Sequence, residues 1–277
     1  MNGTGDVGAY YDALTPLLQQ LWGGNFHIGL WPEDHTGTDT GTADGTTKET
    51  AGEVTAAGDR LTDLLIGELS PRPDDRVLDV GCGIGHPALR LARATGARVT
   101  GVTISTTQVD LARSAAEGTD IGHLTRFQYA DATALPYPDR SFEAAWAIET
   151  LLHIGEVRRA LAEIRRVLLP GSAFVISDMI LRAPEPGHHE HSVPRLLTQL
   201  LALLSDTGFH VETVTDLDAH LRHSLHRLDA DLDRERHRLH SLHGPQGVDA
   251  LTRILRKTIP GIGQVFGYTV ITTRTAS

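Results

Sequence analysis

The chain has 277 residues, 40% of them hydrophobic, and a formal net charge of −10. The acidic balance argues against a broad surface for nucleic acid, and no apolar stretch is long enough to span a bilayer, so neither partner is expected. The single cysteine, Cys82, cannot form an internal disulfide, and the segment before Lys48 lacks the basic residues of a secretory signal; both features favour a cytoplasmic protein.

Two helices are predicted in the first 70 residues, over about 8–21 and 51–69. The segment between them, residues 37–50, has no large apolar residue, and we expect it to be a flexible surface loop. Prolines at 71 and 73 end the second helix because proline cannot continue one. We interpret residues 1–70 as a helical lid.

From Arg76 onwards, short apolar runs alternate with helical stretches. Strands are predicted over residues 77–80, 99–104, 127–130, 144–148 and 173–179, and helices over 88–95, 106–117 and 156–168. Strands separated by helices of this length predict a parallel sheet with helices on both of its faces. Residues 71–180 are therefore interpreted as one doubly wound α/β core.

The C-terminal part, residues 181–277, continues the same sheet with an insertion. Strands over 209–214 and 265–272 bring the mostly parallel sheet to seven strands. Between them, a helical stripe of leucines predicts a helix over 217–242. This helix packs on the domain, covers a substrate pocket, or does both, as part of a cap insertion over about 217–257.

A glycine-rich loop follows the first strand of this core. Asp79 and Val80 lead directly into glycines at 81, 83 and 85, and Pro87 opens the next helix. Glycines let a backbone turn sharply and approach a ligand closely. The G-x-G-x-G spacing departs from the dinucleotide-binding G-x-G-x-x-G, because His86 stands where the third glycine would be.

This loop resembles the first motif of class I S-adenosylmethionine-dependent methyltransferases, and four later segments match the same family in order. Residues 101–108 resemble the G-[IV]-[TD]-[IL]-S-x-x-Q run at the end of the second strand, and 130–132 the A-D-A element whose carboxylate takes the adenine amino group. Residues 135–142 resemble the loop before strand four, and 169–171 the turn before strand five. The resemblance covers about residues 77–178.

The resemblance implies a Rossmann-like methyltransferase fold, with S-adenosylmethionine as the methyl donor and S-adenosylhomocysteine as product. It places cofactor contacts at Tyr11, Asp79, Gly81, Cys82, Gly83, Gly85, Thr103, Ile104, Gln108, Asp131, Ala132 and Ile148. Many relatives have an acid at position 103, so Gln108 is the expected ribose partner, and Thr103 either assists or only packs. Asp131 has a turn or helix cap as its alternative role. Cys82 is expected to lend backbone contacts only.

Residues 147–153 resemble the E-x-x-x-H segment that follows strand four in small-molecule relatives. Glu149 and His153 are four residues apart and would share a face of a helical turn. His153 is the candidate general base, because an imidazole pKa of about 6.5 suits removal of a proton from a hydroxyl or ammonium group. Its alternative role is a cofactor contact or a turn cap. Glu149 and His27 are weaker catalytic candidates.

The N-terminal Tyr10-Tyr11-Asp12 and residues 22–31 resemble elements of methyltransferases that act on small metabolites, sterols and lipids. An aromatic face favours a cation, so Tyr11 can close over the sulfonium. Candidate substrate contacts, with lid packing as their alternative, are Trp22, Phe26 and Trp31.

Histidines gather at 188–191 and recur between 220 and 243. Prolines and a glycine flank the first group, which indicates an exposed irregular loop, so no metal is expected. We expect methyl transfer to an oxygen or nitrogen of a small molecule in antibiotic-like secondary metabolism. C-methylation of an isoprenoid or lipid, and a cyclase that binds S-adenosylmethionine without transfer, stay open. The acceptor and the oligomeric state, with a homodimer among the options, also stay open.

Overall fold

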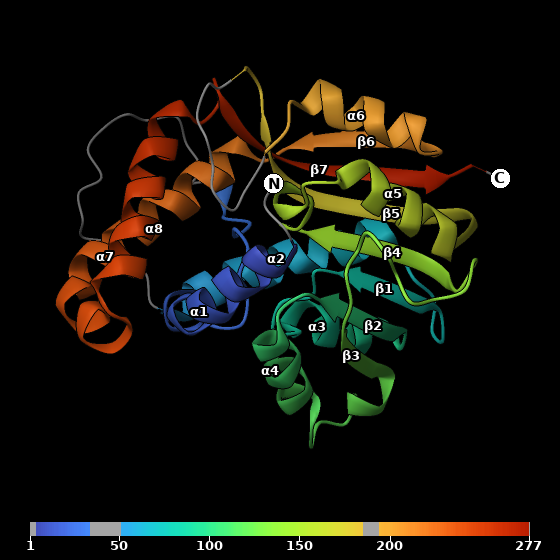
Figure 1. Cartoon of the computed structure of the whole chain (residues 1–277), viewed down its shortest axis with the longest axis horizontal. Helices are drawn as coiled ribbons and strands as arrows, with labels where there is room; N and C mark the ends of the chain where they lie inside the picture. The colour runs from blue at the N-terminus through green and yellow to red at the C-terminus, as the bar shows by residue number, and fades with distance from the viewer. Residues whose placement is uncertain (1–3, 34–50, 185–193, 277) are drawn as a thin grey trace.

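The computed structural model describes residues 4–33, 51–184 and 194–276. Seven strands form one sheet in the order β3-β2-β1-β4-β5-β7-β6 (Figure 1). Their bounds are Arg76–Val80 (β1), Arg98–Thr103 (β2), Thr125–Tyr129 (β3), Phe142–Ile148 (β4), Leu168–Leu181 (β5), Phe209–Asp216 (β6) and Phe266–Thr275 (β7). The first five strands pair in parallel, and β7 runs antiparallel to both β5 and β6. The predicted doubly wound, mostly parallel sheet of seven strands is confirmed.

Strand β5 is longer than the predicted 173–179. Leu168 already pairs with Phe142, and regular pairing resumes between Ala173 and Ala144 after a shift in register. Gly171 supplies the positive φ of 75° within this irregular stretch. Residues 170–171 therefore interrupt the ladder without ending the strand, because a bulge can absorb them.

Helices cover both faces of the sheet, as predicted. Their bounds are Ala51–Leu69 (α2), His86–Thr95 (α3), Thr106–Ala116 (α4), Val157–Val167 (α5) and Leu197–Asp206 (α6). Within β4, Trp146 packs on the side of α2 and α3, whereas Ala145 and Ala147 pack on the side of α5 and α6. Both faces of the central strands are thus buried, which explains their continuous apolar runs.

The remaining helices lie beyond the carboxyl ends of β1 and β4 (Figure 1). They are α1 (Thr4–Trp22), α7 (Asp218–His243) and α8 (Pro245–Thr258). Three short 3-10 turns complete the fold: η2 (Gly122–Leu124) leads into β3, η3 (Leu151–His153) follows β4, and η4 (Ile259–Gly261) follows α8. The predicted leucine stripe of α7 is buried in the core. The predicted helix over 217–242 is confirmed as α7, whereas α8, which begins after Gly244, was not predicted as a separate helix.

Candidate active site

A cavity of about 1480 Å³ opens where the strand order reverses between β1 and β4. Its walls come from the loops after β1, β2, β3 and β4, and from helices α1, α7 and α8. Open α/β sheets bind ligands at such a reversal. Pockets for one drug-sized ligand measure roughly 300–1,000 Å³, so this cavity has room for two small molecules side by side.

The glycine loop after β1 is held by its own backbone. The amides of Gly81 and Cys82 donate to the carbonyl of Val102 at 2.8 and 3.0 Å, which folds the loop over the end of β2. Gly83 has a φ of +53°, and a Cβ built on it would meet only Phe26 Cδ2, at 4.0 Å. The space in front of Gly83 therefore belongs to the cavity, and the loop forms a cradle for a ligand. Gly85, further along the loop, is buried beneath Phe127.

Two buried side chains stand at this loop. Asp79 lines the cavity, and its Oδ2 makes no hydrogen bond of normal geometry with the described residues, while the indole of Trp146 on the paired strand lies near enough to lower the pKa of Asp79. Burial raises the pKa of Asp79 to about 7. A buried carboxylate oxygen without a partner is unusual and suits a ligand that brings a donor. Burial also raises the pKa of Cys82 well above its usual range, which disfavours a reactive thiolate.

The end of β2 brings together the residues predicted to hold a ribose. Thr103 Oγ1 donates to Gln108 Oε1 at 2.7 Å, and both residues line the cavity with Ile104. Gln108 Nε2 also donates to Thr15 of α1 at 3.3 Å. Asp12 accepts from the Ser105 hydroxyl, which itself caps the start of α4. The Tyr-Tyr-Asp motif thus ties α1 to the cavity floor, a role that its sequence did not indicate.

The third cofactor element, at the end of β3, also lines the cavity through Asp131 and Ala132. Asp131 Oδ1 accepts from both the amide and the hydroxyl of Thr133, each at 2.8 Å. One oxygen therefore closes a local turn, which is the alternative role foreseen for this residue. Because a carboxylate has two oxygens, the turn leaves the second one available to a ligand.

His153 contacts Tyr11 in the wall of the cavity. Tyr11 Oη lies 2.6 Å from His153 Nε2, and the two rings meet edge to face with centroids 5.1 Å apart. Burial raises the pKa of Tyr11 well above its usual range, so the phenol stays neutral and can donate to the imidazole. Helix α1 and the η3 turn meet at this contact, which joins residues 142 positions apart in sequence.

The expected helical turn shared by Glu149 and His153 is wrong. Glu149 has a left-handed φ of 46°, and its amide donates to Ser177 O at 2.7 Å, so it extends the sheet and η3 begins only at Leu151. Its Oε1 accepts from Ile28 N at 2.9 Å and from Tyr268 Oη at 3.0 Å. Burial raises the pKa of Glu149 to about 7. No local signal could indicate Tyr268, because it reaches the cavity from β7.

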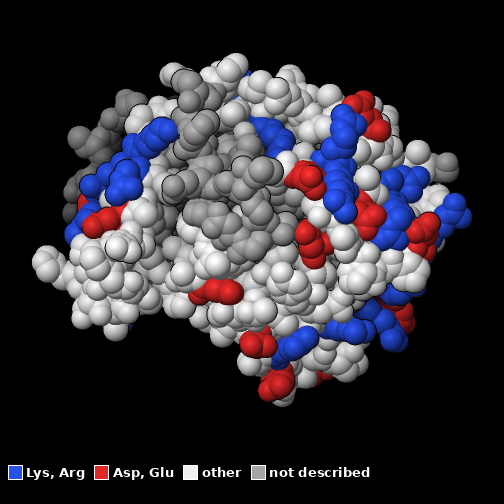
Figure 2. Space-filling view, in the orientation of Figure 1, with Lys and Arg blue, Asp and Glu red and all other residues white. Residues whose placement is uncertain are grey.

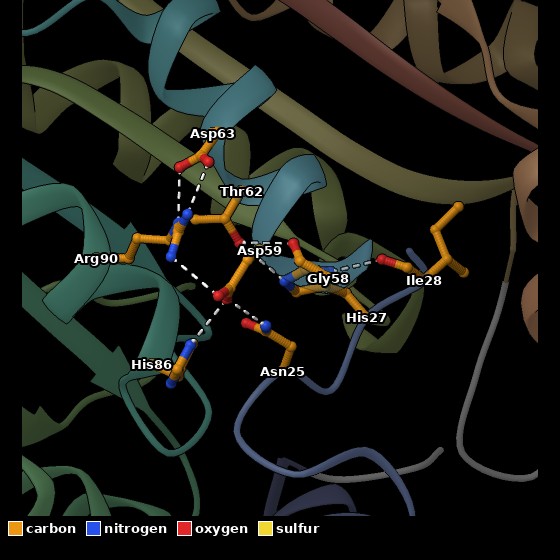
Figure 3. Close-up of polar contacts among 9 residues, drawn as sticks. All are labelled: Asn25, His27, Ile28, Gly58, Asp59, Thr62, Asp63, His86 and Arg90. Carbon is orange, nitrogen blue, oxygen red and sulfur yellow. Dashed lines mark hydrogen bonds and ion pairs between the residues drawn. The ribbon is translucent and has the colours of Figure 1, made fainter. Parts of the chain in front are cut away.

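The segment after α1 is fixed against α2 and α3 (Figure 3). Asp59 of α2 accepts from Asn25 at 2.9 Å and from Arg90 of α3 at 2.9 Å, and lies 3.1 Å from His86. His27 uses both ring nitrogens internally: Nδ1 lies 2.8 Å from Ile28 O, and Nε2 lies 3.2 Å from Thr62 Oγ1. Burial lowers the pKa of His27 to about 4.

The aromatic candidates divide into two groups. Trp22 and Phe26 line the cavity, together with Ile148. Trp31 is not among the lining residues: its indole Nε1 donates to Ser224 of α7 at 2.8 Å, and its ring lies 4.3 Å from that of His223. The sequence could not tell these two roles apart, because a tryptophan can equally line a cavity or pack between helices. Three leucines of the predicted stripe on α7 also line the cavity: Leu221, Leu225 and Leu228. Helix α8, which was not predicted, adds apolar residues (Ala250, Leu251, Ile254 and Leu255) and the basic Arg253 and Lys257.

Within the described ranges, no group of three or more His, Cys, Asp or Glu side chains is arranged to hold a metal. The histidine-rich segment 188–191 and the whole of the predicted loop 37–50 lie outside those ranges. In the same part of the chain, no helix combines the length and apolarity needed to cross a bilayer.

Comparison with known proteins agrees with this geometry. Residues 78–176 match the family model of a methyltransferase domain. The 27-O-demethylrifamycin SV methyltransferase of Amycolatopsis mediterranei is 36% identical over 79% of this chain and 79% of its own length. The O-methyltransferase cnsE of Penicillium expansum is 40% identical over 79% of this chain and 77% of its own length.

Two solved structures have the same fold. The [4+2]-cyclase SpnF shares 33% identity and a TM-score of 0.84, covering 99% of this chain and 97% of its own. A geranyl diphosphate C-methyltransferase from Streptomyces coelicolor, solved with S-adenosyl-L-homocysteine, shares 20% identity and a TM-score of 0.75, covering 99% of this chain and 98% of its own. The cradle at Gly83 and the unpartnered Asp79 oxygen fit that cofactor. The chain belongs to the class I S-adenosylmethionine-dependent methyltransferases.

Proposed function

We propose that this enzyme methylates an oxygen or nitrogen atom of a small specialised metabolite. The observation that carries this proposal is the Tyr11–His153 pair, because it puts a candidate base inside the same cavity as the cofactor loop. The names of the relatives from Amycolatopsis and Penicillium describe O-methylation and support the same class of reaction.

The cofactor-binding residues have distinct tasks in this proposal. S-Adenosylmethionine supplies a methyl group on a cationic sulfur that leaves as a neutral thioether. The Gly83 cradle and the Asp79 carboxylate would hold its amino acid end. Thr103 and Gln108 would hold the ribose, and Asp131 the adenine amino group.

His153 acts on the acceptor. Its Nε2 takes the proton that the acceptor hydroxyl or ammonium group loses as that atom becomes the nucleophile. Tyr11 already hydrogen-bonds this nitrogen, so the acceptor either replaces the phenol or approaches beside it. Glu149 Oε1 and both ring nitrogens of His27 have hydrogen-bond partners, and we assign these two residues the role of fixing the segment around Ile28.

The rest of the cavity favours a bulky apolar acceptor. Leucines of α7 and residues of α8 form its outer wall, so we propose that these helices cap the acceptor while α1 and α2 form a lid. Basic and acidic side chains lie side by side over α5 in Figure 2, and several pair there, as Arg166 does with Glu163 at 2.8 Å. Such mixing of charge disfavours a polyanionic substrate such as nucleic acid.

A second candidate is cyclisation without methyl transfer, because the similarity to the [4+2]-cyclase extends over nearly the whole chain. The two functions differ in their by-product. We would incubate the enzyme with S-adenosylmethionine and a panel of hydroxylated polyketides, amines and isoprenoids, and measure S-adenosylhomocysteine together with each product. Stoichiometric S-adenosylhomocysteine with an O- or N-methylated compound supports our proposal. Ring closure without it supports the cyclase, and a C-methylated isoprenoid contradicts both.

The base is tested by His153→Gln. General-base catalysis contributes about 10²- to 10⁴-fold, so we expect kcat to fall by at least about 100-fold while the Kd for S-adenosylmethionine changes little. The matched control is His210→Gln, since His210 is exposed on β6 and does not line the cavity. Full activity of His153→Gln would refute the base assignment.

A further inference from the structure

The η3 turn that carries His153 has little stability of its own. It contains three residues, Leu151–His153, and is closed by two backbone hydrogen bonds: His153 N to Thr150 O at 3.0 Å and Ile154 N to Leu151 O at 3.1 Å. One turn of 3-10 helix does not offset the entropy of ordering its backbone. Other parts of the protein must therefore hold this turn in place.

Asp178 holds the amide side of the turn. It lies near the end of β5 with 1% of its surface exposed. Its Oδ2 accepts from Leu152 N at 3.1 Å, and its Oδ1 accepts from Met179 N at 2.9 Å. Buried polar groups are normally hydrogen-bonded, and these two contacts occupy both carboxyl oxygens of Asp178. The residue directly before His153 is thus fixed to the central sheet.

Arg195 holds the carbonyl side. Its Nη1 donates to Leu151 O at 3.0 Å, and its Nη2 donates to Ile154 O and, at 3.2 Å, to Gly155 O. The planar guanidinium can bind several carbonyls at once, which a lysine cannot. Arg195 is itself anchored to β5, since its carbonyl accepts from Leu181 N at 2.7 Å.

The two residues hold opposite sides of the turn. Burial lowers the pKa of Arg195, and ionisation of Asp178 would oppose that shift. Both attach to β5, and their contacts bracket His153 in sequence, at Leu152 on one side and at Ile154 on the other. Neither residue appears among those that line the cavity.

We propose that Asp178 and Arg195 are positioning residues, which clamp the Leu151–Gly155 backbone so that the His153 imidazole keeps its place in the cavity. This inference rests on the proposed role of His153 as base. A displacement of about 1 Å at a catalytic group can cost on the order of 100-fold in rate. The clamp therefore acts on turnover, whereas the glycine cradle, after β1, keeps its cofactor contacts.

The test compares Arg195→Gln with wild type, using the panel acceptor that wild type methylates fastest. We expect kcat to fall by about 10- to 100-fold, with the Kd for S-adenosylmethionine, measured by calorimetry, within about threefold of wild type. Arg195→Lys should lose less, because one ammonium group restores only part of the fork. The matched control is Arg158→Gln. Arg158 and Arg195 line one surface groove, but Arg158 pairs with Asp206 at 2.9 Å, so the kcat of this variant should equal that of wild type.

A double-mutant cycle separates positioning from general destabilisation. If Arg195 acts through His153, adding Arg195→Gln to His153→Gln should lower kcat by less than about threefold more, because effects that act through one group are not additive. If Arg195→Gln lowered kcat equally in wild type and in His153→Gln, or left kcat at the wild-type value, the positioning role of Arg195 would be refuted. Should Arg195→Gln fail to fold, Arg195→Lys carries the same comparison. Full activity of His153→Gln alone would instead refute the base, which is a distinguishable failure.

Discussion

The cradle at Gly83 offers a substitution whose effects on folding and on binding separate. Gly83 has a φ of +53°, and a Cβ there would meet only Phe26 Cδ2, at 4.0 Å. In Gly83→Ala, the left-handed conformation alone should therefore lower the free energy of unfolding, by about 1–2 kcal/mol. The new methyl group projects into the cavity, so the affinity for S-adenosylmethionine should fall by at least about tenfold, equivalent to about 1.4 kcal/mol.

Gly118→Ala is the matched control for this variant. Gly118 has a φ of +71°, is exposed, and a Cβ there would meet nothing within 4 Å. It should therefore lose a similar amount of stability and keep the wild-type Kd. Urea denaturation of the unliganded proteins measures the first quantity, and calorimetry with S-adenosylmethionine and S-adenosylhomocysteine measures the second. Unchanged affinity for S-adenosylmethionine in Gly83→Ala, or equal losses of affinity in both variants, would refute the proposal that the Gly83 loop binds the cofactor.

Three further outcomes are expected. Asp79→Asn should weaken S-adenosylmethionine binding by about tenfold in calorimetry, and tighter binding would contradict this. At pH values above 7 the same variant should unfold at a higher urea concentration than wild type, because burial disfavours the ionised Asp79. The free energy of unfolding should fall between pH 6.5 and 8, because the folded chain keeps protons on Glu149 and Asp178, with pKa values of about 7 and 8, that the unfolded chain has lost. Below about pH 6.5 the lowered pKa of His27, about 4, opposes this trend. Glu149→Gln should make the free energy of unfolding, measured by denaturation from pH 6 to 9, depend less steeply on pH. An unchanged dependence would contradict this explanation. Trp31→Phe should cost about 1 kcal/mol of stability through its lost hydrogen bond while kcat stays at wild type, and a large loss of kcat would place Trp31 at the acceptor.

Much of the fold could be predicted because local patterns determine it. Helix α2 has the predicted bounds, and the buried strands appear as short apolar runs in the sequence. The glycine loop and Asp131 were identified because their chemistry depends on backbone conformation and on a single carboxylate within one short segment. These features need no knowledge of the distant parts of the chain.

The remainder of the site depends on tertiary contacts that no local pattern encodes. Tyr268 reaches Glu149 from β7, and Arg195 reaches the η3 turn from the segment after β5. Their residue types are ordinary for a strand and a loop. The orientation of Trp31 toward α7 and the left-handed backbone of Glu149 follow from packing between elements, which also explains why the expected helical turn at Glu149 is wrong.

The most direct test of the account uses S-adenosylmethionine with a deuterated methyl group and the metabolite panel, followed by mass spectrometry and NMR of the products. We expect one acceptor to carry the intact CD3 group on oxygen or nitrogen, with one S-adenosylhomocysteine formed per product. A product rearranged or cyclised without deuterium, while the labelled donor is recovered unchanged, would contradict methyl transfer by this enzyme.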